Sequence, residues 1–185
     1  TSTTTVVTPA SYATDYRVDF ESGLAADWTS DGSTTTGHNA PSRVLYRNLW
    51  SSTRSFVTTS ARIDNISAGD VFRFAYRYSN YSAGTGGTSL GAGDSLKVLI
   101  STDCGVNFST LDKIHSGNHI TSADMRLMEY DLSAYAGQKI VIRFAAEWGT
   151  GDYYLDLDEV YVGTPLSSNT LVSSNYNGAQ ISCKG

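Results

Sequence analysis

Basic residues, proline, cysteine and long apolar runs are all scarce in this sequence. Its 185 residues contain 13 Lys and Arg against 18 Asp and Glu, which gives a formal net charge of -5. This mild acidity argues against a nucleic-acid-binding protein, which normally presents a basic face. Because no run of about 20 apolar residues occurs, no segment is predicted to span a membrane as a helix.

Metal-binding and disulfide patterns are equally sparse. The chain has two cysteines and three histidines, too few and too scattered to predict a zinc site. Cys104 and Cys183 could form one disulfide, but their spacing does not decide whether they are paired.

Local signatures of catalysis are missing as well. The sequence has no HExxH helix and no G-x-S-x-G nucleophile turn. Its Gly-rich stretch 82–94 lacks the lysine of a phosphate-binding loop. A glycosidase needs only two carboxylates, which carry no local signature, so that class stays open. We predict that the chain is not an enzyme.

Alternation of apolar and other residues is the dominant pattern. It runs through VFRFAYRYSNY (71–81), DSLKVLIST (94–102) and QKIVIRFAAEW (138–148). Side chains of a strand point alternately to its two faces, so each segment is predicted to be a strand with one buried face. Gly-containing turns separate these strands, and many short strands with such turns indicate an all-β sandwich or barrel.

Composition shifts suggest the domain boundaries. Residues 1–15 are rich in Thr, Ser and Ala and are predicted to be a linker. The domain is expected to span 16–163. Residues 164–185, which begin with Thr-Pro, are expected to be a linker or a tail leading to a neighbouring domain.

The strand YYLDLDEVYVG (153–163) carries an unusual amount of negative charge. Alternation places Asp156 and Asp158 on the face opposite the core. Glu159 would then point inward with Leu157, unless a β-bulge shifts the register. An inward carboxylate has to be paired, hydrogen-bonded or bound to a metal, because isolated burial is very costly.

A second acidic pair, Asp19 and Glu21, lies in the predicted opening strand VDFES. If the first and last strands of the domain are neighbours, the acids of both converge. Clustered carboxylate and carbonyl oxygens favour a hard cation such as Ca²⁺. The alternative is ordinary surface acids or an ion pair, with Arg143 as one possible partner.

Aromatic residues are abundant, with three Trp and twelve Tyr. Such rings fill sandwich cores, and they also stack on sugar rings. Trp50, with Arg47 nearby, and Trp148 lie in predicted loops, as does Tyr81. Because loops at the ends of a sandwich often carry recognition, these four residues are candidates for ligand binding.

Several stretches together resemble the cleaved adhesin domains of gingipain-type proteins and the related choice-of-anchor J domains. They are DFESGLAADW (19–28), NAPSRVLY (39–46), DSLKVLISTDCGVNFSTL (94–111), YDLSAYAGQKIVIRF (130–144) and YYLDLDEVYVG (153–163). The resemblance implies a jelly-roll β-sandwich of two antiparallel sheets within a larger secreted or cell-surface protein, commonly bacterial. It also implies a structural calcium, for which the matching acids are Glu21 and Asp158, with Asp19 as a weaker candidate.

The function expected from this resemblance is adhesion, or binding of a protein or substrate, beside a catalytic domain in the full-length chain. The alternative is a carbohydrate-binding module that targets a polysaccharide hydrolase to its substrate. A third hypothesis is a structural spacer without a ligand. The partner is therefore expected to be an extracellular protein or polysaccharide.

Overall fold

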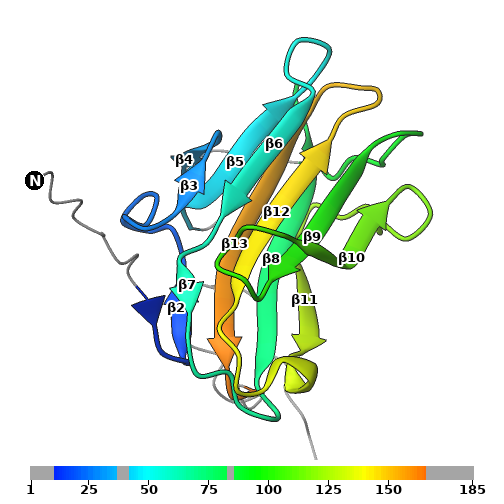
Figure 1. Ribbon diagram of the computed structural model, residues 1–185. Coiled ribbons are helices and arrows are strands. Elements are labelled where there is room, and N and C mark those ends of the chain that lie inside the picture. Colours follow the sequence, from blue (N-terminus) through cyan, green and yellow to red (C-terminus); the bar gives the residue numbers. More distant parts are fainter. Residues whose placement is uncertain (1–10, 37–41, 83–85, 166–185) are drawn as a thin grey trace, which may run out of the picture.

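The computed structural model describes residues 11–36, 42–82 and 86–165, and these form a β-sandwich of two antiparallel sheets (Figure 1). One sheet contains β2 (Tyr16–Val18), β4 (Ser33–Thr35), β5 (Val44–Leu49), β8 (Val71–Asn80), β11 (Arg126–Asp131) and β13 (Tyr153–Gly163). The other contains β3 (Thr29–Ser30), β6 (Ser55–Thr59), β9 (Ser95–Ser101), β10 (Ser109–His115) and β12 (Val141–Glu147).

The strand order is β11-β8-β13-β5-β4 in the six-stranded sheet, with β2 also paired to β13, and β10-β9-β12-β6-β3 in the five-stranded sheet. A short parallel pair, β1 (Ser11–Tyr12) and β7 (Arg62–Ile63), and a single 3₁₀ turn, η1 (Ser133–Tyr135), complete the described elements. Within these ranges, no helix has the length and hydropathy needed to cross a membrane.

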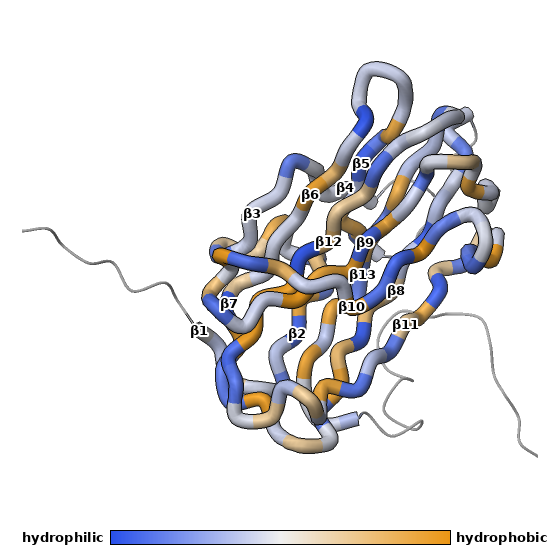
Figure 2. The backbone as a smooth tube through the Cα atoms, turned by 45° about the vertical axis from the view of Figure 1, so that its right-hand side comes forward, coloured by the Kyte–Doolittle hydropathy of each residue, from blue (hydrophilic) through white to orange (hydrophobic). Residues whose placement is uncertain are grey.

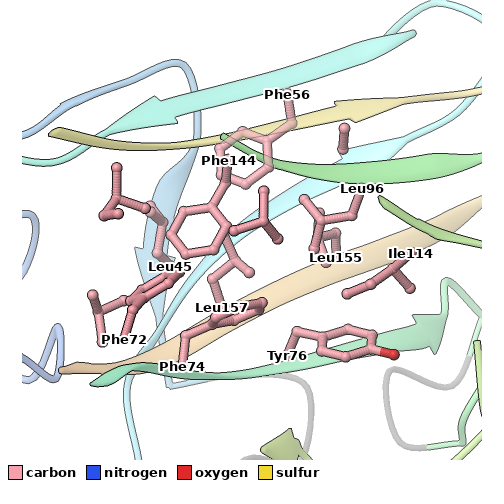
Figure 3. Close-up of a cluster of buried hydrophobic side chains, with 14 of the residues drawn as sticks. Leu45, Phe56, Phe72, Phe74, Tyr76, Leu96, Ile114, Phe144, Leu155 and Leu157 are labelled. Carbon is pink, nitrogen blue, oxygen red and sulfur yellow. The ribbon is translucent and has the colours of Figure 1, made fainter. Parts of the chain in front are cut away.

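Alternation along the strands builds the core between the two sheets. The inward residues of β8 are Phe72, Phe74, Tyr76 and Tyr78, each at most 1% exposed. Figure 3 shows Phe144 and Phe56 from the five-stranded sheet facing this row, and the rings of Phe74 and Phe144 meet edge to face. The hydropathy colouring in Figure 2 changes repeatedly along the strands. The predicted all-β sandwich is confirmed.

A β-bulge interrupts β13 where the sequence places its acids. The register with β8 shifts between Asp158 and Tyr161, and Glu159 has a left-handed φ of 50°. The extra residue turns Glu159 away from the core. Its carboxylate pairs with Arg17 on the surface. The bulge, which was one of two alternatives from the sequence, explains how a strand with three acids fits between buried neighbours.

Ordered pairing begins inside the segment predicted to be a linker. Ser11 and Tyr12 pair with β7, and the Tyr12 ring packs against Tyr16 at a centroid distance of 5.3 Å. The opening strand is also shorter than expected, because Phe20 takes a left-handed φ of 56° and its side chain enters the core. Most of the predicted tail, from residue 166, lies outside the described residues.

Candidate functional site

The first and last strands of the domain are neighbours, as predicted. β2 pairs antiparallel with β13 through Val18 and Val160. This brings acids from both ends of the chain to one short segment. Glu21 Oε1 accepts the backbone N–H of Arg43 at 2.8 Å, and Asp158 Oδ2 accepts the hydroxyl of Ser42 at 2.9 Å.

Asp158 is an unusual carboxylate because it is only 4% exposed. Its pKa is raised to about 7, chiefly by burial and also by the negative charges of Glu159 and Glu21, against the opposing hydrogen bonds from the Glu159 N–H and Ser42. No ion pair of the described chain includes Asp158. A bound cation would remove this electrostatic penalty, because it reverses the local preference for the neutral acid.

The remaining predicted charge partners take other roles. Asp19 Oδ1 accepts the N–H of Glu21 at 3.2 Å, as in a turn. In the described ranges, no three His, Cys, Asp or Glu side chains are grouped closely enough to hold a metal by themselves. Arg143 as an ion-pair partner is wrong, because its guanidinium lies 3.8 Å from the Phe108 ring centroid on the five-stranded sheet.

Four aromatic side chains gather on the outer side of the six-stranded sheet. The Tyr46 and Tyr154 rings have centroids 5.9 Å apart, and the Tyr81 ring lies 5.4 Å from that of Tyr154. Trp50 follows β5, four positions after Tyr46 and therefore on the same side of the strand. Tyr81 and Trp50 are 49% and 41% exposed. We call these four residues the aromatic face.

A pocket of about 230 Å³ adjoins the aromatic face along the edge of β5. β4 pairs only with the first half of β5, so within the described ranges no strand covers the β5 edge beyond Tyr46 on that side. The pocket is lined by Ser33, Tyr46, Arg47, Asn48, Trp50 and Thr53. Its lining therefore combines two aromatic rings with hydroxyl, amide and guanidinium groups.

Trp148 is placed differently from Trp50. It is partly buried against the core, its Nε1–H donates to the Gly151 carbonyl at 3.0 Å, and the Arg54 guanidinium carbon lies 5.1 Å from its ring centroid. The structure thus places Trp50 and Tyr81 on one side of the sheet and leaves Trp148 with a packing role. Arg47 lines the same pocket as Trp50 but lies on the side of β5 that carries Leu45 and Leu49. Cys104 is exposed in a turn, and Cys183 lies outside the described residues.

Sequence reasoning missed Tyr46, Tyr154 and Asn48. The signal that could have found Tyr154 was the alternation of the last strand, which assigns it to the outer side. Asn48 Nδ2 donates to Asp152 Oδ1 at 2.8 Å and so holds the end of β5 to the start of β13. Which outer residues become neighbours depends on the β5–β13 register, which no local pattern specifies.

Two buried carboxylates, Asp156 and Asp94, connect strands and loops next to the aromatic face. Asp156, on the outer side of β13, pairs with Arg77 of β8 at 2.8 Å, and the two side chains are 0% and 3% exposed. Asp94 accepts the N–H groups of Gly91, Gly149 and Thr150 and the hydroxyl of Tyr153. Asp94 thereby ties the loop before β9 to the loop between β12 and β13.

Comparisons with solved structures identify the architecture. The K1 cleaved adhesin domain of Lys-gingipain from Porphyromonas gingivalis W83 superposes with a TM-score of 0.57 at 19% identity, over 81% of this chain and 98% of that one. The K3 cleaved adhesin domain of the same protein gives 0.55 at 16% identity, over 80% and 95%. This chain has the jelly-roll fold of a cleaved adhesin domain. The expectation from the sequence resemblance is confirmed at the level of fold.

The cleaved adhesin fold is shared with other modules. A carbohydrate-binding module specific for non-crystalline cellulose superposes with a TM-score of 0.51 at 10% identity, over 84% of this chain and all of that one. No protein-family description and no curated protein matches the sequence. At these identities the likeness concerns the fold, and the ligand has to be argued from the side chains of this chain.

Proposed function

We propose that this chain is a non-catalytic module that binds a polysaccharide through the aromatic face, within a larger secreted or cell-surface protein. The observation that carries this proposal is the exposure of Trp50 and Tyr81 beside a polar pocket on a rigid sheet. In the full-length protein the module would hold a neighbouring catalytic domain close to its substrate.

The chemistry of the aromatic face suits a sugar ring. Aromatic rings provide apolar contact area with the C–H groups of a sugar, and nearby hydroxyl and amide groups can hydrogen-bond its hydroxyls. Trp50 supplies such a ring at the pocket, and Ser33, Asn48 and Thr53 supply the polar groups. The strands hold these groups in place, which lowers the entropic cost of binding.

Trp50→Ala and Tyr81→Ala are each expected to weaken polysaccharide binding at least fivefold, since central aromatic contacts cost more than about 1 kcal/mol when truncated. The measurement is affinity electrophoresis or calorimetry against a panel of soluble plant, algal and bacterial polysaccharides. Tyr12→Ala is the matched control, because Tyr12 is 39% exposed and lies on β1, away from this face. Undiminished binding by both Trp50→Ala and Tyr81→Ala would contradict the proposal.

A protein ligand is the second candidate, and the fold shared with adhesin domains favours it. Tyr and Trp are also the residues most enriched at protein interfaces. Binding to host-matrix proteins such as collagen or fibronectin, lost in the same two variants and without any polysaccharide binding, would establish this alternative. No binding to either class would favour the spacer hypothesis.

The proposal includes a structural Ca²⁺ at the junction of β2 and β13. Ca²⁺ takes about six to eight oxygen ligands, which include carboxylates, hydroxyls, carbonyls and water. Glu21 and Asp158 would supply the charged oxygens, and Ser42 a hydroxyl, with Asp19 positioning Glu21 through its backbone. The burial of Asp158, without an ion-pair partner among the described residues, supports this assignment.

Removing Ca²⁺ with EDTA is expected to lower the Tm by about 5–10 °C, since an ion at 100 times its Kd adds about 2.7 kcal/mol to the stability. Asp158→Asn should abolish this response while melting no lower than the wild type in EDTA, because it removes a carboxylate whose burial is unfavourable without a cation. Glu159→Gln is the control and should keep the response. Equal Tm values of the wild type with and without EDTA would count against the site.

A further inference from the structure

Arg47 has no acidic partner among the described residues, whereas four other arginines are paired. Arg17, Arg62, Arg73 and Arg77 each form an ion pair with an Asp or Glu. Arg47 forms none with any described residue. Its Nη1 donates to the backbone carbonyl of Asp31, and its Nε is buried without a hydrogen-bond partner.

The positive charge of Arg47 is not balanced by a nearby carboxylate of the described chain. A guanidinium stays charged at any accessible pH, and although Arg47 is only partly buried, its Nε is withdrawn from water without a counter-charge. One carbonyl contact satisfies only a single donor out of the five that the group carries. Because Arg47 also lines the pocket at the β5 edge, the missing negative charge could be supplied there by a ligand.

The nearby acids are already engaged elsewhere. Asp31 Oδ1 accepts the Val57 N–H at 2.9 Å, and Asp152 Oδ1 accepts the Asn48 amide at 2.8 Å. Neither forms an ion pair with Arg47. The pocket therefore joins an uncompensated cation to the exposed ring of Trp50 and to the small hydroxyl residues Ser33 and Thr53.

We propose that the pocket beside Trp50 recognises an anionic sugar unit, with Arg47 binding its carboxylate or sulfate group. This inference rests on the proposed function and specifies the ligand class. Trp50 would contact the sugar ring, and the planar guanidinium would donate its N–H groups to the oxyanion, a geometry that carboxylate and sulfate both satisfy. A uronic acid or a sulfated sugar within a polysaccharide would provide this chemistry.

Matched polymer pairs test the proposal on the intact chain. Polygalacturonate is compared with its methyl ester, and dextran sulfate with dextran, so that each pair differs only in the anionic group. The wild type should bind at least one anionic member about tenfold more tightly than its neutral counterpart, as expected for a charge-assisted hydrogen bond. The polymer pair that shows the preference distinguishes carboxylate from sulfate.

Variants assign the effect to Arg47. Arg47→Gln should remove the anionic preference while leaving the Trp50-dependent affinity, and Arg47→Lys should restore part of it because the charge is kept. Arg54→Gln is the matched control, since Arg54 lies in the same turn region but does not line the pocket. The Tm of each variant verifies that the fold is intact.

The outcomes separate the two proposals. Equal binding of anionic and neutral polymers, unchanged by Arg47→Gln, would overturn the anionic specificity and leave the polysaccharide-binding function standing. An equal loss of preference in Arg47→Gln and Arg54→Gln would show a general charge effect and also overturn it. Binding to none of the four polymers, nor to any member of the wider panel, would overturn both.

Discussion

Replacing Asp156 with alanine is expected to lower the free energy of unfolding by about 3–5 kcal/mol, the usual cost of removing one partner from a buried ion pair. Arg77 would lose the carboxylate that accepts its Nη2–H at 2.8 Å and its Nε–H at 3.3 Å. The guanidinium is 3% exposed, so water cannot replace these bonds without rearrangement. Thermal and urea unfolding measure the loss, which corresponds to a Tm lower by roughly 10 °C.

The surface pair between Arg17 and Glu159 is the matched control. Its side chains are 47% and 40% exposed, so Glu159→Ala should cost less than about 1 kcal/mol. The double variant Arg77→Met with Asp156→Leu should recover much of the loss, because apolar residues of similar size often replace a buried ion pair without penalty. A single Asp156→Ala variant as stable as Glu159→Ala would refute the expected effect.

Asp94→Ala is expected to have the second large effect, a loss of about 3 kcal/mol, because several donors to one buried carboxylate would be left unsatisfied. Asp94 is 3% exposed, and its oxygens accept the N–H groups of Gly91 and Gly149 at 2.7 and 2.6 Å and the Tyr153 hydroxyl at 2.8 Å. The loops joined by these bonds should loosen together. Hydrogen exchange at the Gly91 and Gly149 amides, beside a thermal melt, measures this loosening.

Asp103 provides the control for this second prediction. It also accepts several hydrogen bonds, from Asn107 and Ser101, and these lower its pKa to about 2, but it lies in an exposed turn. Asp103→Ala should therefore loosen only its own turn and lower the Tm much less. An Asp94→Ala protein with unchanged exchange at Gly91 and Gly149 would contradict the proposed link between the two loops.

The strand content was predictable because it depends on short-range information. The alternation in 71–81 predicts a core-facing side whatever the partner strand is, and β8 has this side, although its other side, with Arg73 and Arg77, is buried as well. The same logic predicted the core-facing residues of the last strand up to Leu157, but it did not predict the burial of Asp156 on the other side. At Glu159 it allowed either an inward side chain or a β-bulge. The choice depends on how β13 pairs with β8 and β2, which the residues of β13 alone do not specify.

The candidate sites were predictable only in part. Glu21 and Asp158 were found because each lies in a motif of the resembled domains, and in the folded chain Glu21 bonds the Arg43 N–H while Asp158 bonds the Ser42 hydroxyl. Tyr46 and Tyr154 were not singled out, since a tyrosine in a strand fits the core equally well. Trp148 was grouped with Trp50 because both lie outside predicted strands, yet Trp148 packs partly buried against the core.

The sequence by itself determined the class of the fold, the buried face of each long strand and the acidic character of the two strand ends, because hydrophobic period and residue type are local properties. Only the tertiary structure decided that Arg47 has no acidic partner, that Trp50 and Tyr81 share one surface, and that Asp158 is buried beside Glu21. Each of these facts depends on the register between strands distant in the chain, and that register is set by the packing of the whole sandwich.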